Sequence, residues 1–292
     1  MTLETGTVYF FEQGMAEIPE AVSLFGFPVS FYGICMVLAA VTGVSVALRE
    51  ARKRKLEREL TLTLLWITIL SALLGARIYY AVFQWHPFSE SPLLAFDFRS
   101  GGLAYFGALF GVWPAAKWYC RRKAAEFEKA ADVLCAGAAA AAVPVWLGCA
   151  FMREPVGRFS EGICSVRIGT EYLPREAEST LLKELLSKAY IINDEVCISM
   201  HPVALYGVLS AVLILLILWL TKRFRKQDGD LFQMYLFLNA LSCLCLEPFR
   251  ASRCRIWGTE IPINSLVAIV ILLVLAVVEI RYRLRQRRRK RG

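Results

Sequence analysis

This 292-residue sequence has few histidines. It has no cysteine pairs with the spacing of a zinc site and no basic segment at its N-terminus. It has two histidines, His86 and His201, and none of its nine cysteines falls in a CxxC or cysteine–histidine spacing, which argues against a zinc site. The first 26 residues contain no lysine or arginine, so they lack the basic start of a cleavable signal peptide. We therefore expect no metal, no cofactor and no signal peptide.

The sequence also lacks a detectable internal repeat and the paired, interrupted apolar segments of many secondary transporters, which disfavours a transporter. It is instead rich in apolar sequence, with 57% hydrophobic residues and a mean hydropathy of +0.49. These values are too high for an ordinary soluble domain. Seven runs approach the roughly 20 residues that a spanning helix requires. They cover residues 28–48, 61–83, 102–119, 130–152, 202–221, 230–247 and 261–280.

Most of the 34 lysines and arginines lie in clusters that follow odd-numbered runs, at residues 49–58, 117–123, 222–226 and 281–291. Since cytoplasmic loops carry the excess of basic residues, this pattern predicts an N-terminus outside and a cytoplasmic C-terminus. We predict an all-α integral membrane protein with seven transmembrane helices, forming a single polytopic domain over residues 1–292. The basic tail at 281–292 directly follows a span, so we interpret it as a topology anchor at anionic lipid rather than a nucleic-acid-binding segment.

The largest segment between the predicted spans is an outside loop at about residues 153–200. Within it, Arg175 to Tyr190 is a candidate amphipathic helix with leucines on one face. This helix either caps the bundle or lies in the membrane interface, where it guides a lipid or peptide substrate. Cys164 and Cys197 belong to the same loop; a disulfide between them is one alternative if the exterior is oxidising, and two thiols are the other.

With this orientation, polar residues from six predicted helices lie in the outer half of the membrane or just beyond it. Charges there are costly unless solvated or paired, so together they indicate a shared cavity. Simpler alternatives are that Arg77 extends to the outer headgroups and that Glu247 pairs with Arg250. His201 is the group near this cavity whose ordinary pKa suits proton transfer near neutrality. The candidate residues are Tyr32, Arg77, Gly101, Gly102, Glu154, Gly157, Arg158, His201, Glu247 and Arg250.

Six short segments within residues 27–280 contain these residues: Phe31-Tyr32-Gly33, Gly75-Ala76-Arg77-Ile78-Tyr79-Tyr80, Gly101-Gly102-Leu103 with Gly107 and Gly111, Glu154 with Gly157-Arg158, His201-Pro202 with Leu205-Tyr206, and Glu247 with Phe249-Arg250. In this order they resemble the bacterial prolipoprotein diacylglyceryl transferases. The resemblance implies a protein of the bacterial cytoplasmic membrane that moves a diacylglyceryl group from phosphatidylglycerol to the lipobox cysteine of a prolipoprotein signal peptide. It implies thiolate attack on a glycerol carbon with departure of glycerol phosphate, which needs a base and cations. We assign His201, Glu154 and Tyr32 to catalysis and the other candidates to lipid and phosphate binding.

The sequence departs from the pattern of that family at four positions where the family is polar. Phe106 replaces a histidine, and Cys243 replaces an arginine. Trp146 and Cys149 replace a second arginine and an asparagine. Each lost cation removes stabilisation of a phosphate in a low-dielectric pocket. Three alternatives therefore stay open: a transferase with the family's substrates, a transferase with altered substrates, and a catalytically impaired relative that binds lipid or lipoprotein.

Overall fold

The computed structural model of the protein describes residues 5–10, 14–19, 21–24, 27–83, 85, 104–162, 165–169, 187–192, 195–221, 227–251 and 262–289. The chain folds into two compact units. Unit 1 consists of Met1–Thr42, Ala140–Leu213 and Leu246–Arg253. Unit 2 consists of Gly43–Ala139, Ile214–Cys245 and Cys254–Gly292. The single polytopic domain that the sequence predicts stays a prediction.

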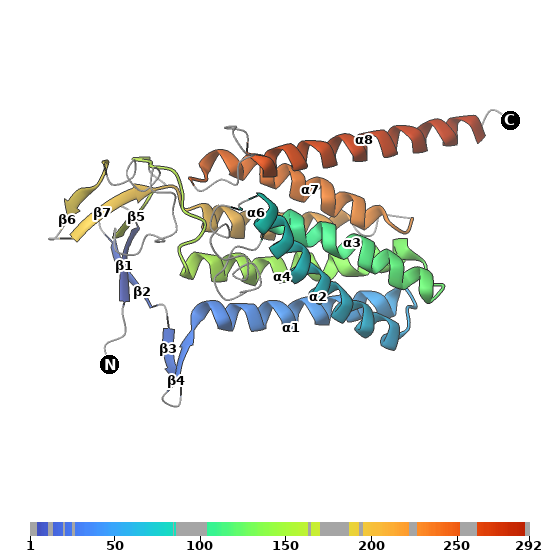
Figure 1. Ribbon diagram of the computed structural model, residues 1–292, viewed down its shortest axis with the longest axis horizontal. Coiled ribbons are helices and arrows are strands. Elements are labelled where there is room, and N and C mark those ends of the chain that lie inside the picture. The colour runs from blue at the N-terminus through green and yellow to red at the C-terminus, as the bar shows by residue number, and fades with distance from the viewer. Residues whose placement is uncertain are drawn as a thin grey trace. The chain divides into compact units, whose positions relative to one another are not determined.

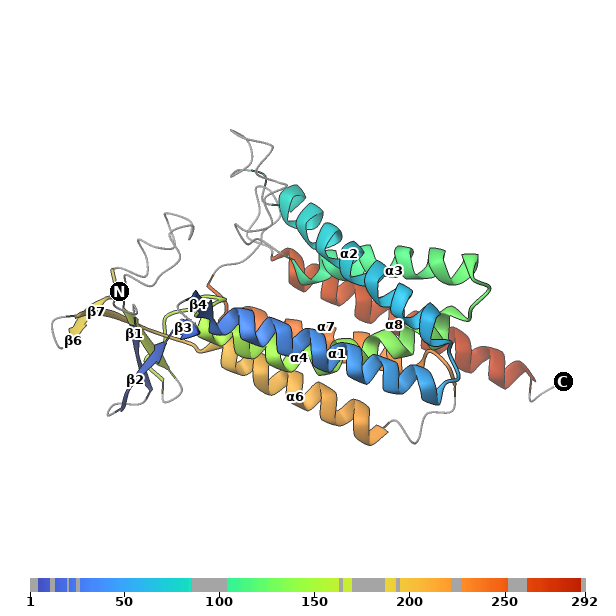
Figure 2. The ribbon, with the colours of Figure 1, turned by 90° about the horizontal axis from the view of Figure 1, so that it is seen from below.

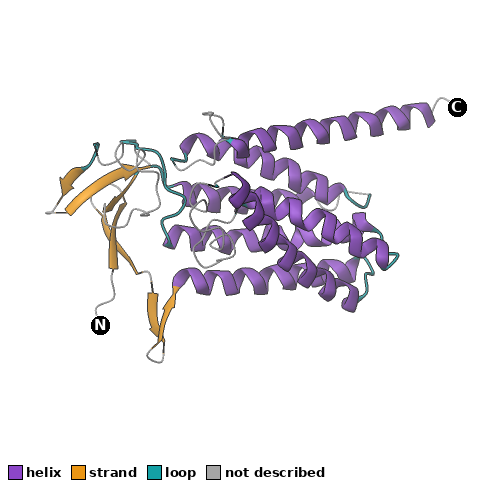
Figure 3. Ribbon diagram, in the orientation of Figure 1, coloured by secondary structure: helices purple, strands orange, loops and turns teal. Residues whose placement is uncertain are grey.

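Long helices occupy all seven of the predicted apolar runs (Figures 1 and 3). Most of them begin and end within a few residues of the prediction, while the first and the last continue into basic residues beyond the apolar run. The helices are α1 (Phe31–Lys53), α2 (Arg58–Phe83), α3 (Tyr105–Arg122), α4 (Phe127–Phe151), α6 (Val203–Thr221), α7 (Asp230–Leu246) and α8 (Ile263–Arg289).

Six of these helices are long and apolar enough to cross a membrane, and α3 is the exception. α3 has 18 residues, and its last turn carries Arg121 and Arg122, which lower its hydropathy. Large apolar side chains of the other helices are exposed, such as Trp66 (66%), Trp219 (70%) and Leu273 (61%). Exposure of this kind is costly in water and favourable in lipid. The described helices are therefore those of a multi-pass integral membrane protein.

In unit 2, α2 and α3 lie side by side because glycines bring their backbones together (Figure 2). A Cβ atom at Gly75 would lie 2.9 Å from the Cα of Gly111, and one at Gly107 would lie 2.5 Å from the Gly75 carbonyl oxygen. Small residues allow this close approach between membrane helices. The contact fixes the positions of Arg77 on α2 and Phe106 on α3.

A buried ionic cluster ties the chain after α1 to the start of α7, also within unit 2. Arg54 Nη1 lies 2.8 Å from Asp132 Oδ2 on α4 and 2.7 Å from Asp228 Oδ1. Asp132 is fully buried, and its carboxylate accepts hydrogen bonds from the amides of Gly229 (2.9 Å) and Phe232 (2.8 Å). Phe232 belongs to the first turn of α7 and Gly229 directly precedes that helix. Amide groups at the start of a helix have no partner within it. Asp132 therefore caps α7 from another helix.

Strands in unit 1 are an addition to the all-α fold that the sequence predicts (Figure 3). Five of them form an antiparallel sheet in the order β2-β1-β5-β7-β6, and a separate hairpin of β3 and β4 precedes α1. The strands are β1 (Thr5–Phe10), β2 (Gly14–Pro19), β3 (Ala21–Leu24), β4 (Phe27–Ser30), β5 (Val166–Gly169), β6 (Tyr190–Ile192) and β7 (Glu195–Met200). The predicted outside loop thus contains three strands, and β7 leads directly into His201.

Several predicted features lie outside the described residues. These include Gly101, Gly102, Cys164 and therefore the Cys164–Cys197 pairing, as well as the end of the basic tail at 290–292. The amphipathic helix predicted for Arg175 to Tyr190 also lies mainly outside them. Its final residue, Tyr190, is described and begins β6.

Candidate functional site

Residues 156–160, which we call the bridging segment, connect distant parts of unit 1. Gly157 pairs in antiparallel fashion with Arg250. The Arg158 amide donates to the Phe249 carbonyl at 2.8 Å, and the Arg158 carbonyl accepts from the His201 amide at 2.9 Å. Backbone pairing on both edges of this segment therefore brings Arg158, His201 and Arg250 to neighbouring positions, although they are far apart in the sequence.

The local sequence explains why the chain leaves α4 and forms this segment. α4 ends at Phe151, and Arg153 then adopts a left-handed conformation with φ of 56°, as residues after helix ends often do. Pro155 cannot donate the amide hydrogen bond that would continue the helix. At Gly157 a Cβ atom would overlap the His201 carbonyl oxygen and lie 2.9 Å from its carbon. Only glycine allows the two backbones to approach this closely.

His201 is held by contacts on its backbone and its ring. Its Nδ1 lies 3.3 Å from the Tyr206 hydroxyl on α6, and its ring meets the Phe249 ring edge to face, with centroids 4.9 Å apart. The Tyr206 and Phe249 rings also contact each other at 5.6 Å. Burial lowers the pKa of His201 below its usual value, since desolvation disfavours the charged imidazolium. A neutral imidazole at pH 7 is the form that can accept a proton.

Glu247 and Arg250 form an ion pair within unit 1, as the structural alternative for these residues predicts. Glu247 begins a short 3-10 helix, η6 (Glu247–Phe249), directly after α7. Its Oε2 lies 3.6 Å from Arg250 Nη1, and Glu247 is 2% exposed. The Arg250 side chain is 29% exposed, so its guanidinium reaches beyond the buried carboxylate. A planar guanidinium presents several donors in a fork that matches the geometry of a phosphate.

Tyr32 and Glu154 also belong to unit 1. Tyr32 packs over Gly148 of α4, where a Cβ atom would lie 3.1 Å from its ring. Tyr32 lies on α1 and therefore contacts α4 near its end at Phe151, and Glu154 follows that end in the chain.

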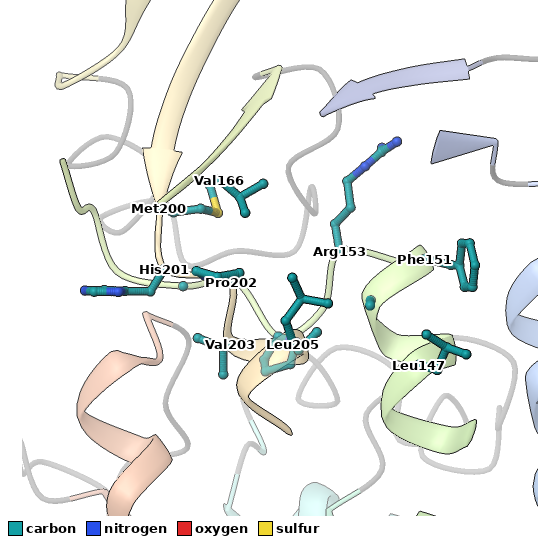
Figure 4. A pocket seen from close by; sticks show the side chains of 13 residues that line it. Leu147, Phe151, Arg153, Val166, Met200, His201, Pro202, Val203 and Leu205 are labelled. Atoms are coloured by element: carbon teal, nitrogen blue, oxygen red, sulfur yellow. The ribbon is translucent and has the colours of Figure 1, made fainter. Parts of the chain in front are cut away.

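A pocket of about 170 Å³ lies beside the bridging segment (Figure 4). Its walls come from the end of α4, from Val166 and Met200 of the sheet, and from the start of α6, and they are almost wholly apolar. Figure 4 shows the His201 side chain directed away from that of Arg153. Pockets for complete small molecules are larger, at roughly 300–1,000 Å³. This pocket has room for one aliphatic group, adjacent to the His201 backbone.

Two of the four residues at which the resemblance predicts a departure from the family's pattern lie in one apolar cluster of unit 2. Phe106 is 2% exposed and packs with Tyr79, Ala240 and Ile263, and Cys243 packs against the same cluster. In the same unit, Arg77 is 3% exposed and lies 5.9 Å from the Tyr80 ring centroid. Arg77 is thus buried rather than extended to the surface.

Trp146, the third replacement, lies directly against Gly207 in unit 1. A Cβ atom at Gly207 would overlap the Trp146 indole, with its Cζ3 atom only 2.6 Å away. The indole on α4 therefore uses the space that a side chain at position 207 of α6 would need. Large and small residues at facing positions fill a core without strain. The replacement at position 146 is accommodated by close packing between two helices.

Unit 1 brings together most of the site residues predicted from the sequence: Tyr32, Glu154, Gly157, Arg158, His201, Glu247 and Arg250. Arg77 belongs to unit 2, and Gly101 and Gly102 lie outside the described residues. Gly148 and Gly207 were missed as contact positions because a single glycine carries little signal by itself. Tyr206 belongs to a segment that carries the resemblance, together with Leu205, but the sequence assigns it no role of its own.

Comparison with known proteins gives a consistent assignment. The family model described as prolipoprotein diacylglyceryl transferase matches residues 19–281. Three proteins named phosphatidylglycerol–prolipoprotein diacylglyceryl transferase are similar along most of the chain. The protein of Shouchella clausii is 27% identical over 242 residues, covering 83% of this chain and 82% of its own length. That of Finegoldia magna is 26% identical over 253 residues, covering 86% and 90%.

The third relative, from Bacillus mycoides, is 25% identical over 252 residues and covers 86% of this chain and 88% of its own length. The match of the family model extends from the strands before α1 into α8, so it includes both the helices and the bridging segment. The chain belongs to the prolipoprotein diacylglyceryl transferase family.

Proposed function

We propose that the protein transfers a diacylglyceryl group from phosphatidylglycerol to the cysteine thiol of a prolipoprotein. The names of its relatives supply these two substrates. The observation that carries the proposal for this chain is the bridging segment, whose backbone pairs with His201 on one edge and Arg250 on the other. A proton acceptor and two arginines next to each other are what the reaction requires.

In the proposed reaction, the acceptor thiol loses its proton and the thiolate attacks a glycerol carbon of the lipid. The carbon–oxygen bond to the phosphate breaks, and glycerol phosphate leaves with the electron pair. We assign proton acceptance to His201, because its lowered pKa keeps it neutral at pH 7. Glu154 and Tyr32 are assigned to orienting the acceptor cysteine beside α4. Arg158 and Arg250 of unit 1 are assigned to the phosphate, and the assignment of Arg77 to lipid binding stays a prediction from the sequence.

The test uses the purified protein in vesicles that contain phosphatidylglycerol, with a lipobox peptide as acceptor. We expect mass spectrometry to detect the diacylglyceryl-modified peptide. Vesicles of phosphatidylcholine alone serve as the negative control, and the Shouchella clausii protein serves as a positive control. Absence of product from folded protein, while the positive control gives product, would rule out these substrates.

Replacement of Arg250 by alanine is expected to reduce the rate of that transfer by about 100-fold, because it removes a cation that stabilises the leaving phosphate. It also leaves the buried Glu247 carboxylate without this ion pair. Arg121→Ala is the matched control, since Arg121 is an exposed arginine at the far end of α3. Initial rates from the same vesicle assay compare the two variants. Equal rates for Arg250→Ala and Arg121→Ala would contradict the assignment.

The apolar replacements favour a second candidate, a family member that binds lipid or a lipoprotein segment without transferring it. Phe106 and Cys243 share one apolar cluster, and Trp146 packs on Gly207. These positions are filled by packed side chains, which leaves no open space for the cations of the family's pattern. A protein that binds phosphatidylglycerol vesicles and lipobox peptide, yet forms no product, would support this second candidate.

We also propose that all seven helices span the bacterial cytoplasmic membrane, with the N-terminus outside and the C-terminus in the cytoplasm. The chain supports this at the basic end of α3, where Lys117 lies over the Trp113 ring and Arg122 over the Trp118 ring, each at 5.1 Å. Tryptophan beside basic residues is typical of a membrane–water interface. If α3 spans, the termini lie on opposite sides. With only six spans they lie on the same side.

Reporter fusions in bacteria distinguish these topologies. We expect a fluorescent protein after residue 292 to be fluorescent and alkaline phosphatase at that position to be inactive. At the N-terminus we expect the reverse result. Reporters that place both termini on one side of the membrane would show that α3 does not span it.

A further inference from the structure

We propose that Tyr206 is a positioning residue that fixes the tautomer of His201. In this proposal the Nδ1–H group of His201 donates its hydrogen bond to the Tyr206 hydroxyl oxygen, and the lone pair on Nε2 is left to accept the proton of the substrate thiol. The inference deepens the proposed function and rests on it for the role of the imidazole as a base. The pairing itself is a property of unit 1 and can be measured without substrate.

The contacts of His201 leave its ring little freedom. The backbone amide donates a hydrogen bond to the Arg158 carbonyl at 2.9 Å, which fixes the backbone of His201 against the bridging segment. The Phe249 ring contacts the imidazole at 4.9 Å and the Tyr206 ring at 5.6 Å. This aromatic side chain therefore holds both partners of the 3.3 Å pair between Nδ1 and the Tyr206 hydroxyl.

Only one of the two ring nitrogens has a partner among the residues that the structure describes. That nitrogen is Nδ1, bonded to Tyr206. In a neutral imidazole one nitrogen carries the hydrogen and the other the lone pair, and the bond made by one nitrogen sets the state of the other. A hydrogen on Nδ1 satisfies Tyr206 as an acceptor and leaves Nε2 as the basic nitrogen. The opposite tautomer would place a hydrogen where the thiol proton must arrive.

The charged residues on the elements next to His201 are Arg158 on the bridging segment and Glu247 and Arg250 on or after η6. The cause of the lowered pKa of His201 is burial, which disfavours the imidazolium. In the proposed step Nε2 takes the thiol proton, the carbon–sulfur bond forms as the carbon–oxygen bond breaks, and the proton then passes to the departing phosphate or to water.

The tautomer is measured directly by nitrogen NMR of protein labelled with ¹⁵N-histidine. The chain has only two histidines, so His86→Asn leaves the signals of His201 alone. We expect the protonated nitrogen of the neutral form to be Nδ1 and the unprotonated one to be Nε2. The reverse pattern in the otherwise unaltered protein would overturn the proposal, and this measurement does not depend on any variant of Tyr206.

Tyr206→Phe provides a second test through the sign of a pKa change. If Tyr206 accepts from Nδ1–H, its oxygen also stabilises the imidazolium, and the pKa of His201 falls when the hydroxyl is removed. If Tyr206 donates to Nδ1 instead, the hydroxyl stabilises the neutral ring, and the pKa rises on removal. A rise, or no change, would refute the proposal. Tyr105→Phe is the matched control, because it removes a 3.4 Å hydrogen bond to Tyr235 in unit 2.

In the transfer assay, Tyr206→Phe is expected to lower kcat about tenfold, the effect of one net hydrogen bond, with KM changed less than twofold. The acidic limb of the pH–rate profile is expected to move to lower pH, in step with the pKa of His201. Tyr105→Phe should leave both unchanged. A protein with the predicted tautomer but no transfer activity would support the positioning by Tyr206 and refute the proposed function, so the two failures are distinguishable.

Discussion

Alanine at position 157 is expected to reduce the transfer rate by about 100-fold, the scale of loss when reacting groups are misplaced by about 1 Å. The added Cβ atom would overlap the carbonyl oxygen of His201 and lie 3.1 Å from its nitrogen. All of these are backbone atoms, so no side-chain rotation can relieve the contact. The bridging segment must move away from His201, which lengthens the hydrogen bond between the His201 amide and the Arg158 carbonyl.

Gly162→Ala is the matched control for this variant. Gly162 follows the bridging segment, and a Cβ atom there would lie 3.4 Å from the Ser160 hydroxyl, an ordinary van der Waals contact. Initial rates in phosphatidylglycerol vesicles and the His201 NMR signals should change in Gly157→Ala and stay unchanged in Gly162→Ala. Unchanged His201 signals in Gly157→Ala would contradict the close approach on which the site depends.

Replacement of Asp132 by alanine is expected to have the largest effect on stability, at about 3–5 kcal/mol. It leaves Arg54 without one of its three carboxylate partners, Glu50, Asp132 and Asp228, and removes the acceptor of two amides at the start of α7. The side chain of Asp132 is fully buried, so water cannot replace these contacts. In a chain of this size we expect the midpoint of thermal unfolding, followed by circular dichroism in detergent, to fall by about 10 °C.

Glu126→Ala is the matched control, because Glu126 directly precedes α4 and pairs with Lys129 in the first turn of that helix. The oxygen and nitrogen of this pair are 2.7 Å apart, but the Glu126 side chain is 63% exposed. Ion pairs of this kind contribute less than about 1 kcal/mol, so Glu126→Ala should change the midpoint by only one or two degrees, roughly. Equal midpoints for Asp132→Ala and Glu126→Ala would show that the buried cluster does not stabilise the fold.

The positions of the helices could be predicted from the sequence because lipid imposes a simple requirement. A spanning helix must satisfy its backbone hydrogen bonds internally, and it needs roughly 20 apolar residues to cross the bilayer. Such apolar runs can be recognised in the sequence without knowing which residues are in contact. α6 shows this most clearly: residues 202–221 were predicted and Val203–Thr221 form the helix. The prediction for α3 was correct for the helix, although its basic residues leave its membrane span a proposal.

The sheet of unit 1 could not be predicted by the same reasoning. β1 pairs with β5 through contacts such as Val8 with Ile168, and these residues are separated in the sequence by α1, α2, α3 and α4. Pairing of this kind depends on which segments meet in the folded protein, and strand propensity varies strongly with such context. In the outside loop the most evident sequence pattern is the spacing of its leucines, which favours a helix at 175–190.

The site was predicted as a set of residues but not as an arrangement. Their chemistry and the resemblance to the family identify Gly157, Arg158, His201 and Arg250 as candidates, whereas the backbone pairing that joins them has no sequence signature. The replacements show the same limit. Trp146 appeared only as a lost arginine in the sequence, yet its indole needs a glycine at position 207 on another helix to fit.

The central claim is that this chain cleaves phosphatidylglycerol at the carbon–oxygen bond and passes the diacylglyceryl group to a thiol. Phosphorus NMR of the vesicle reaction tests it most directly, because the leaving group has a signal distinct from the lipid. We predict that glycerol phosphate appears only when protein and lipobox peptide are both present, with one molecule released for each peptide modified. Folded protein that releases none, in vesicles where the Finegoldia magna relative does release it, would contradict the claim.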